Sequence, residues 1–502
     1  MLKQSFIETD DNSSQPKSKK KGSGPPNRMN DLVYRDWMKF QKSFFRYTTD
    51  QNLVEENIYF FTKAIWPDGL PSKCLIIGFD NFDKNKIAEP RIVDCISAKS
   101  FDDIVNSLVK TREMDFIFID LRWLITGEET LFTYIENYSE EMMQSLKLAL
   151  KPLRYCCILT TMPDTNGGGF PIPWSVAAAS RDYLRLRDEK IGLVDKKEQI
   201  YYCLFMQAEK DKRPGCKFIY SSINLTKIDL IIPGWIIPKP PPRKKNEVLH
   251  PAKFPETLIS EFINLFTKQG EKVLDPMAGT GSTVISAIRT GRNGYGIDLM
   301  PEFVKISQDR IAEEQVPSLF DNLCSPAKGY VIQGDATKLS DIAELDGLIF
   351  DYVITSPPYW SMLTNPGSEN QEKRRKQNLR LAYSENPNDL GNIQNYDKFL
   401  KLLVNVYCEV ETKLKPGGYL TVIVKNVKRE HIVYPLAWDI VLKLCGKNGT
   451  YEYVGNTFWC QDDVGIKPFA VGIHWVSNTL HHYCLHFRKP SGRKLFHLGQ
   501  SK

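Results

Sequence analysis

Apolar and polar positions alternate in blocks along the second half of the chain, and the blocks predict strands and helices in turn. Strands are expected at 272–275, 293–298, 329–333, 352–354 and 419–424, with a terminal pair at 451–459 and 482–488. Helices are expected after Gly281, at 396–414 and at 434–444. Strands that alternate with helices are typical of an open, largely parallel sheet. The pattern therefore predicts an α/β fold for this half.

One of the predicted strands ends in two prolines. The apolar run Tyr352–Ile354 leads into Thr355-Ser-Pro-Pro-Tyr-Trp360, and proline can neither extend a helix nor donate to a sheet. The prolines fix a rigid backbone just past the carboxyl end of the strand, where open α/β sheets bind their ligands. The Ser356 hydroxyl, the Pro357 carbonyl and the flat ring of Tyr359 suit a planar base that carries an exocyclic amine.

A glycine-rich turn precedes this strand by about eighty residues. It lies in Lys272-Val-Leu-Asp-Pro-Met-Ala-Gly-Thr-Gly-Ser-Thr283, where the glycines let the backbone approach a ligand and the following helix N-terminus favours a carboxylate. The next strand ends at Asp298, where an acid can hold a ribose diol. The third predicted strand is followed by Gly334 and Asp335. A Gly-x-Gly alone leaves a nicotinamide cofactor open, although this turn is not the usual six-residue dinucleotide form.

Together these motifs resemble those of the S-adenosylmethionine-dependent DNA amino-methyltransferases, the N4-cytosine/N6-adenine family. In that family an Asp-Pro-x-x-Gly-x-Gly-x element binds the cofactor, and (Ser/Asp/Asn)-Pro-Pro-(Tyr/Phe) is the catalytic loop. The matching segments here are 275–282 and 356–359, and 250–258 resembles the segment that precedes the cofactor strand. The likeness covers roughly residues 248–490. Met277, where Phe is usual, is a mild departure.

The resemblance implies a role for each matched residue. The implied catalytic residues are Ser356, Pro357, Pro358 and Tyr359, and the implied cofactor-binding residues are Phe254, Asp275, Pro276, Ala278, Gly279, Gly281, Asp298 and Asp335. Asp275 and the glycine turn would surround the methionine end of the cofactor, Asp298 its ribose and Asp335 its adenine. The implied fold is a Rossmann-like, seven-stranded methyltransferase sheet. S-adenosylmethionine would be the methyl donor and S-adenosylhomocysteine the product.

The chemistry of an exocyclic amine explains the need for such a loop. Its lone pair is delocalised into the ring, and hydrogen bonds from the amine to Ser356 and to the Pro357 carbonyl favour a pyramidal nitrogen that can attack the methyl group. A base inside a duplex cannot reach the pocket, so it must be flipped out. Serine at the first catalytic position favours N4 of cytosine, since Asp or Asn is commoner in adenine enzymes; N6 of adenine stays open.

The residues of the chain also argue for or against other classes of function. Methylation at cytosine C5 requires a Cys nucleophile in a Pro-Cys loop, and the chain has no Pro-Cys dipeptide. This excludes the C5 class. An RNA base methyltransferase and a non-catalytic DNA-binding subunit remain alternatives, although intact cofactor and catalytic motifs argue against a mere scaffold.

The first half of the chain repeats the second half weakly. Lys73–Asp80 lies where a cofactor strand would be but lacks a Gly-x-Gly, and Asp115–Trp123 parallels the catalytic strand without its prolines. Leu148–Leu159 parallels the Leu-Lys-Pro segment that begins at Leu414. We therefore expect residues 30–225 to form a degenerate methyltransferase-like α/β domain, with an unrelated α/β domain as the alternative. Aromatic residues at helical spacing between 30 and 62 predict amphipathic helices.

Composition sets the remaining domain boundaries. Residues 1–29 are polar and rich in Lys, Ser and Gly, so a disordered tail is expected. A proline-rich linker is expected at 226–247, followed by the catalytic domain at 248–502. Eleven scattered cysteines without a CxxC pair indicate free thiols in a reducing compartment and no metal site.

The expected partners follow from charge and from the resemblance. A net charge of +6 permits nucleic-acid binding through local patches. The polar stretch 361–394 carries Lys373, Arg374, Arg375 and Lys376, and is the expected DNA-contacting loop. The resemblance implies double-stranded DNA as partner and a cytoplasmic, nucleoid-associated prokaryotic protein. A cognate restriction endonuclease stays open, as does the oligomeric state. No run of eighteen apolar residues occurs, so no membrane span is expected.

Overall fold

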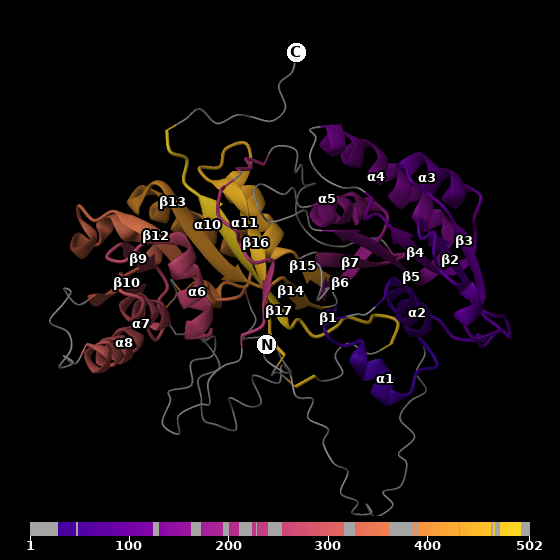
Figure 1. Ribbon diagram of the computed structural model, residues 1–502, viewed down its shortest axis with the longest axis horizontal. Helices are drawn as coiled ribbons and strands as arrows, with labels where there is room; N and C mark the ends of the chain where they lie inside the picture. Colours follow the sequence, from indigo (N-terminus) through magenta and orange to yellow (C-terminus); the bar gives the residue numbers. More distant parts are fainter. Residues whose placement is uncertain are drawn as a thin grey trace, which may run out of the picture.

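Two large β-sheets, each covered by helices, lie side by side in the computed structural model of the chain (Figure 1). The residues that the structure describes are 29–46, 49–123, 130–161, 172–193, 200–209, 223–226, 228–238, 254–315, 327–360, 386, 389–430, 432–462, 465–466 and 472–492. Elements α1 to β7 form what we call the N-terminal half, and elements β8 to β17 form the C-terminal half.

The C-terminal half contains an eight-stranded sheet in the order β11-β10-β9-β12-β13-β17-β16-β8. Its strands are β8 (Trp235–Ile236), β9 (Lys272–Asp275), β10 (Asn293–Asp298), β11 (Gly329–Gln333), β12 (Phe350–Thr355), β13 (Leu414–Val424), β16 (Glu452–Cys460) and β17 (His481–Arg488). Strands β9 to β13 are mutually parallel where they pair, and β17 runs antiparallel between β13 and β16. Reversal of the sequence order at β9 opens a crevice at the carboxyl ends of the strands, where such sheets bind ligands.

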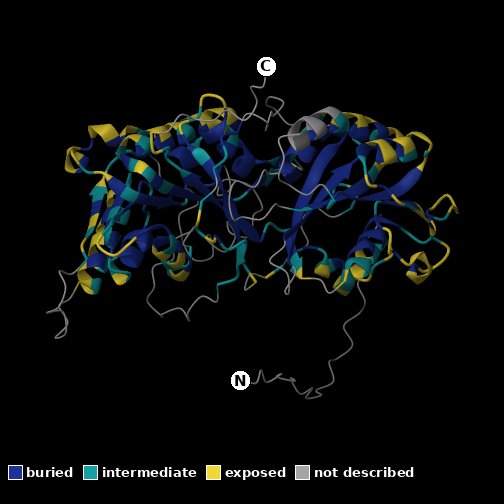
Figure 2. Ribbon diagram, turned by 45° about the horizontal axis from the view of Figure 1, so that its top comes forward, coloured by how far each residue is buried: buried dark blue, intermediate teal, exposed yellow. Residues whose placement is uncertain are grey.

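Helices of the C-terminal half pack against this sheet and bury their apolar faces. They are α6 (Glu256–Phe266), α7 (Ser282–Arg289), α8 (Pro301–Glu314), α10 (Tyr396–Lys413) and α11 (Leu436–Cys445). A short hairpin, β14 (Val427–Arg429) and β15 (Ile432–Tyr434), leaves the end of β13. Figure 2 shows the central strands largely buried, with many exposed residues on the outer faces of the helices. This is the Rossmann-like fold class that the sequence predicts, with β8 as an eighth strand where seven were expected.

The N-terminal half repeats this architecture. Its strands are β1 (Phe44–Arg46), β2 (Lys73–Ile77), β3 (Ile92–Ile96), β4 (Met114–Asp120), β5 (Leu150–Thr161), β6 (Arg185–Leu193) and β7 (Ile200–Gln207). Its helices are α1 (Tyr34–Lys39), α2 (Asp50–Phe61), α3 (Phe101–Val109), α4 (Thr130–Ala149) and α5 (Ile172–Ala179). The strand order β3-β2-β4-β5-β7-β6-β1 matches β10-β9-β12-β13-β17-β16-β8. Among the described residues of this half, counterparts of the edge strand β11, of α7 and of the β14–β15 hairpin are missing.

Strand register makes the two halves comparable residue by residue. Phe116 pairs with Tyr155 in the first sheet as Tyr352 pairs with Tyr419 in the second, and both pairs follow a bulge at the same place. A lysine–aspartate ion pair is duplicated as well. Lys151 Nζ lies 3.0 Å from Asp115 in the N-terminal half, and Lys415 Nζ lies 2.6 Å from Asp351 in the C-terminal half. In each case the same carboxylate also accepts a hydrogen bond from the first residue of the central strand.

Equivalent residues of the two halves meet where the sheets adjoin. The Tyr202 hydroxyl of β7 bonds the Tyr483 hydroxyl of β17, and these tyrosines occupy the same register position. Trp174, the third residue of α5, stacks on Trp438, the third residue of α11, with 5.8 Å between the ring centroids. Contact between equivalent surfaces is the geometry of a two-fold dimer. The chain therefore folds as a fused pseudo-dimer with one apolar core cluster that includes both halves.

Two expectations from the sequence need correction. Phe44 belongs to β1 and not to an amphipathic helix, because it pairs beside β6 at the edge of the sheet. The segment 226–247 is not wholly a linker, since Trp235 and Ile236 pair with β16 and Ile232 is buried in the C-terminal core. Most of the tail at 1–29 and most of the loop at 361–394 lie outside the described residues.

Candidate functional site

A cavity opens at the carboxyl ends of β9, β10, β11 and β12. It opens to solvent at its mouth, and the space between its walls and at that mouth together is about 930 Å³. The lining residues are Phe254, Pro276, Met277, Ala278, Gly279, Thr280, Ser282, Asp298, Leu299, Met300, Phe303, Gly334, Asp335, Ala336, Thr337, Ser356, Pro357, Pro358, Asp389 and Leu390. The glycine turn and the Ser-Pro-Pro segment thus line the same cavity.

The glycine turn is held in place by α8. Gly281 has φ +78°, and a Cβ at this position would lie 2.9 Å from Ser307 Oγ, so only glycine fits without strain. Ser307 Oγ donates to the Gly279 carbonyl at 3.0 Å, and the Arg310 guanidinium donates to the Thr280 carbonyl. The turn therefore begins α7 with its backbone close to the cavity.

Asp275 lies behind the cavity wall. Its carboxylate accepts a hydrogen bond from Thr283 Oγ1 at 2.6 Å and one from the Met277 amide at 3.1 Å. Burial raises the pKa of Asp275 to about 6, and the hydrogen bond from Thr283 partly offsets this effect. The side chain is 1% exposed and does not line the cavity. It supports the turn from below.

Asp298 lines the cavity at the end of β10. Its two oxygens accept hydrogen bonds from the amides of Met300 at 2.9 Å and Gly279 at 2.8 Å. Burial raises the pKa of Asp298 to about 6. Each carboxylate oxygen keeps further acceptor capacity, so this group can accept hydroxyl donors from a ligand.

Asp335 follows β11, the strand that pairs with β10, and caps the short helix at Ala336–Asp341. Its carboxylate accepts from the Thr337 amide at 2.9 Å and from Thr337 Oγ1 at 2.7 Å. The remaining wall is largely apolar, with Phe254, Met300 and Phe303 among its members. Apolar walls with a few placed polar groups suit a ligand with a flat ring and a polar sugar.

The Ser-Pro-Pro-Tyr segment follows β12 and forms the other end of the cavity. Ser356, Pro357 and Pro358 line the cavity, whereas Tyr359 is buried behind them, 5% exposed. Ser356 Oγ and the Tyr359 hydroxyl lie 3.4 Å apart. The Tyr359 ring packs against His482, with 6.0 Å between the ring centroids.

Trp360 belongs to an aromatic cluster beside this segment. Its ring lies 4.6 Å from that of Tyr434 and 5.1 Å from that of Tyr396, and the Arg429 guanidinium lies 5.2 Å above it. These contacts hold the end of the Ser-Pro-Pro-Tyr segment against α10 and the β14–β15 hairpin. The segment that the sequence predicts to be catalytic is therefore packed against other elements on the side away from the cavity.

The structure brings most of the expected site residues together. Of the twelve expected catalytic and cofactor-binding residues, Tyr359, Asp275 and Gly281 do not line the cavity, and the other nine do. Sequence reasoning missed Met300, Phe303, Asp389 and Leu390. Met300 and Phe303 follow Asp298 closely, so they could have been predicted as site residues from their place just after the strand end. Lys373, Arg374, Arg375 and Lys376 lie outside the described residues.

The corresponding place in the N-terminal half is built from different residues. By register, Ile76 replaces Asp275, Ser97 replaces Asp298 and Asp120 replaces Ser356. Arg122, two residues past β4, donates to Asp120 at 2.6 Å and to Asp50 at 2.9 Å. Its guanidinium also lies over the rings of Phe79 and Tyr201. An ion-paired arginine thus occupies the carboxyl end of this sheet.

Among the residues that the structure describes, no group of three or more His, Cys, Asp or Glu side chains could hold a metal ion. Within the same part of the chain, no helix is both long and apolar enough to cross a membrane.

Comparison with known proteins places one segment of the chain in a sequence family. Residues 171–309 match the family model described as DNA methylase, N6_N4_Mtase. The match includes the glycine turn and Asp298 and ends before Ser356.

Three similar proteins show how far the likeness extends. The type II methyltransferase M2.DpnII of Streptococcus pneumoniae is 42% identical over 65 residues, 13% of this chain and 24% of that protein's length. The tRNA (guanine(10)-N2)-dimethyltransferase of Pyrococcus abyssi is 29% identical over 126 residues, 25% of this chain and 34% of its own. The solved 16S rRNA N2 G1207 methyltransferase of T. thermophilus aligns with 84% of this chain and 88% of its own at 12% identity, with a TM-score of 0.26. That score is too low to support any shared detail.

The chain thus spans about a quarter of the length of the first curated relative. The sequence match, the strand order and the glycine turn agree with one another. Residues 171–309 carry the sequence pattern of the N6/N4 DNA methylase family.

Proposed function

We propose that this chain transfers a methyl group from S-adenosylmethionine to the exocyclic N4 of a flipped cytosine in DNA. The observation that carries the proposal is the shared cavity: the glycine turn after β9 and Ser356 to Pro358 after the neighbouring β12 line one continuous space. A methyl donor and an acceptor amine must meet in line for direct transfer. One cavity with both motifs offers that arrangement.

The residues present fit S-adenosylmethionine. The Asp298 carboxylate can accept both ribose hydroxyls, and the adenine ring suits the apolar wall with Asp335 beside it. The N-terminus of α7, beside Gly279, favours the carboxylate of the methionine end. When bound, the cofactor supplies an activated methyl group on a sulfonium.

The chain's own part is to bind and orient the acceptor amine. Ser356 Oγ and the Pro357 carbonyl can accept hydrogen bonds from the two amine hydrogens, which frees the nitrogen lone pair for attack. Tyr359 supports Ser356 from behind through the contact between their hydroxyls. Loss of the proton from the methylated amine completes the transfer, and no covalent bond to the protein forms.

Two other acceptors are candidates for the same site. Adenine N6 presents the same amine chemistry. Serine at position 356 favours cytosine only because Asp or Asn is commoner at this position in the adenine enzymes of the family. An exocyclic amine in RNA is supported by the likeness to a tRNA guanine-N2 dimethyltransferase. Product identification separates all three.

We further propose double-stranded DNA as the partner and a role beside a restriction endonuclease in a prokaryotic cell. The support is the likeness to type II methyltransferases of bacteria. Lys373 to Lys376 remain the proposed phosphate contacts.

The decisive experiment measures labelled methyl transfer from S-adenosylmethionine to unmethylated genomic DNA and to bulk tRNA. Digestion to nucleosides with mass detection then identifies the base. Ser356→Ala should abolish transfer while cofactor binding persists. Asp120→Ala changes the equivalent position of the N-terminal half and is the matched control, with transfer retained. Absence of any methylated nucleoside from the intact protein, with cofactor bound, would overturn the proposal.

A further inference from the structure

The segment between β16 and β17 crosses into the N-terminal half. We call residues 472–480 the arm. Trp475 of the arm is fully buried in the core cluster of the N-terminal half, among Phe40, Phe60, Phe61 and Phe205 at ring-centroid distances of 5.0–5.5 Å. The C-terminal half therefore contributes a core residue to the N-terminal half.

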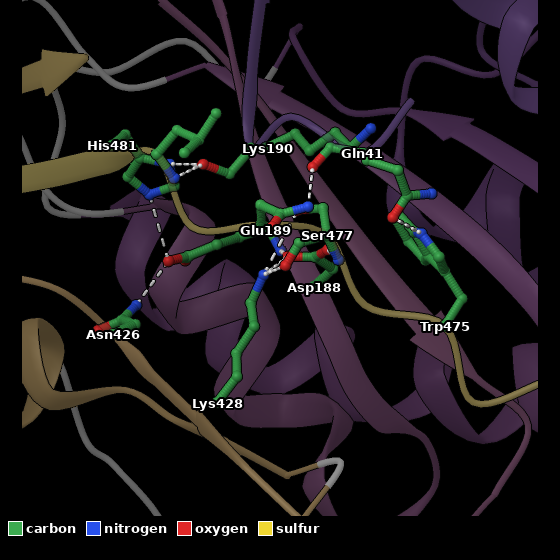
Figure 3. Close-up of polar contacts among 12 residues, drawn as sticks. Gln41, Asp188, Glu189, Lys190, Asn426, Lys428, Trp475, Ser477 and His481 are labelled. Carbon is green, nitrogen blue, oxygen red and sulfur yellow. Dashed lines mark hydrogen bonds and ion pairs between the residues drawn. The ribbon is translucent and has the colours of Figure 1, made fainter. Parts of the chain in front are cut away.

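Main-chain hydrogen bonds fix the arm at both ends. The Ile473 carbonyl accepts from Tyr155 Oη at 2.8 Å and from Gln207 Nε2 at 2.7 Å. The Asn478 amide donates to the Gln41 carbonyl at 2.8 Å. Trp475 Nε1 also donates to Gln41 Oε1 (Figure 3). The path of the arm is thus determined by the N-terminal half.

Asp188 of β6 fixes the middle of the arm. Its carboxylate is fully buried, accepts a hydrogen bond from the Ser477 amide and forms an ion pair with Lys428 of β14 (Figure 3). Lys428 Nζ in turn donates to the Ser477 carbonyl at 3.0 Å. The charges of Asp188 and Lys428 are therefore compensated by each other and by the main chain of Ser477, away from water. An unpaired charge at this buried position is costly, so the relative positions of the three residues are closely constrained.

The end of the arm leads directly to the proposed catalytic segment. Lys425, which follows β13, donates to the Thr479 carbonyl at 3.2 Å. Three residues after Thr479, His482 stacks on Trp459 with 3.9 Å between centroids. The Tyr359 ring lies 6.0 Å from the His482 ring, centroid to centroid. His482 pairs with Trp459 in the sheet and follows the arm closely, so the arm joins the contacts behind Tyr359 and, through the Tyr359 hydroxyl, Ser356.

We propose that Asp188, in the half without the glycine turn, is a positioning residue for the Ser356–Tyr359 segment and acts through the arm, Lys425 and His482. The inference rests on the proposed function for its kinetic readout only. The N-terminal half would then hold the arm that aligns the methyl acceptor, a task its own sheet end no longer performs.

The test is Asp188→Asn in the full-length chain, compared with Asp188→Asn/Lys428→Met. The single change leaves the Lys428 charge unpaired beside Ser477, whereas the double change removes both charges and keeps an acceptor for the Ser477 amide. We expect kcat to fall by about 10²-fold in the single variant, the effect of a misplacement of about 1 Å. The double variant should recover most of it. Affinity for S-adenosylmethionine should stay within about twofold in both, because no arm residue lines the cavity.

Amide hydrogen exchange gives a readout that does not depend on methyl transfer. In Asp188→Asn, peptides that cover 472–482 and 355–360 should lose protection together, while 272–298 keeps it. The control Asp351→Asn alters the ion-paired carboxylate at the other end of β12 and should leave both peptides protected. Loss of amide protection in 472–482 with protection of 355–360 unchanged would overturn the positioning role. Equal loss of protection throughout the chain would overturn it as well. If the intact protein methylates nothing, the proposed function fails, and the exchange result still decides this inference.

Discussion

The two halves of this chain share a sheet and differ in what stands at its carboxyl edge. Both keep the central strand order, the bulge where β4 pairs with β5 and β12 with β13, and the lysine–aspartate pair. In the C-terminal half that edge carries a glycine turn and a cavity, and in the N-terminal half it carries Arg122 paired with two carboxylates. The comparison shows that residues inside the sheet maintain the fold, while residues at strand ends maintain a site.

The largest expected difference concerns the two turn glycines. Gly281→Ala and Gly78→Ala both introduce a Cβ at positive φ, 2.9 Å from Ser307 Oγ and 2.8 Å from the Asp120 carbonyl respectively. Each should cost about 1–3 kcal/mol of stability. Only Gly281→Ala should also weaken S-adenosylmethionine binding, by about 100-fold, in calorimetric titration. Equal loss of binding in both variants would contradict the assignment of the cofactor to the C-terminal half.

Arg122→Met tests how the N-terminal half uses its strand ends. The substitution removes the partner of Asp120 and Asp50, so two carboxylates lose their compensating charge. We expect the free energy of unfolding to fall by about 3 kcal/mol, measured by denaturant titration, with cofactor affinity unchanged. A change in cofactor affinity at constant stability would instead indicate a ligand site in this half.

A pH dependence of cofactor binding should belong to the C-terminal half, because Asp298 lines its cavity. The pKa of Asp298 is raised to about 6 by burial, so the folded protein binds more protons than the unfolded chain between about pH 4 and 6. Stability from this group is therefore greatest at low pH and falls as pH rises through that window. Ribose hydroxyls favour the ionised carboxylate, so cofactor affinity should rise about tenfold from pH 5 to 7 and level off above it. Asp298→Asn should bind more weakly and lose this slope.

The smallest expected difference separates the duplicated ion pairs. Asp115 is fully buried, whereas the Asp351 side chain is 21% exposed and Lys415 is 38% exposed. Asp115→Asn should cost about 2–3 kcal/mol, near the lower end for breaking a buried pair. Asp351→Asn should cost about 1 kcal/mol or less, as for exposed pairs. Thermal unfolding of the two variants compares them directly, and the reverse order would show that burial does not govern these pairs.

The sequence predicted those elements that are specified by a short stretch of consecutive residues. The glycine turn, the strand that ends at Asp298 and the Pro-Pro strand end are each written in fewer than twelve consecutive residues, and all three meet at one cavity. The weak repeat of the first half was also visible, because Leu-Lys-Pro and Tyr-Cys-Leu patterns recur at the same register positions.

Long-range contacts gave no such signal. Nothing in Trp475 or its neighbours indicates that it lies in the core of the other half, since its partners are more than 260 residues away. Asp389 and Leu390 line the cavity although they lie at the end of a polar stretch that indicated only a loop. The place of Asp275 behind the wall follows from packing against Thr283, which a motif does not record.

The buried place of Trp475 has a consequence for the order in which the protein is made. Residues of the N-terminal half leave the ribosome first, yet one aromatic side chain of their core is encoded near the end of the chain. At ordinary translation speeds the interval between β7 and Trp475 lasts on the order of tens of seconds. Throughout that interval the rings of Phe40, Phe60, Phe61 and Phe205 lack their central partner. The first half therefore cannot complete its core until Trp475 has been made. A ribosome that stalls between β7 and Trp475 leaves these apolar side chains uncovered, and chaperones can recognise such a surface.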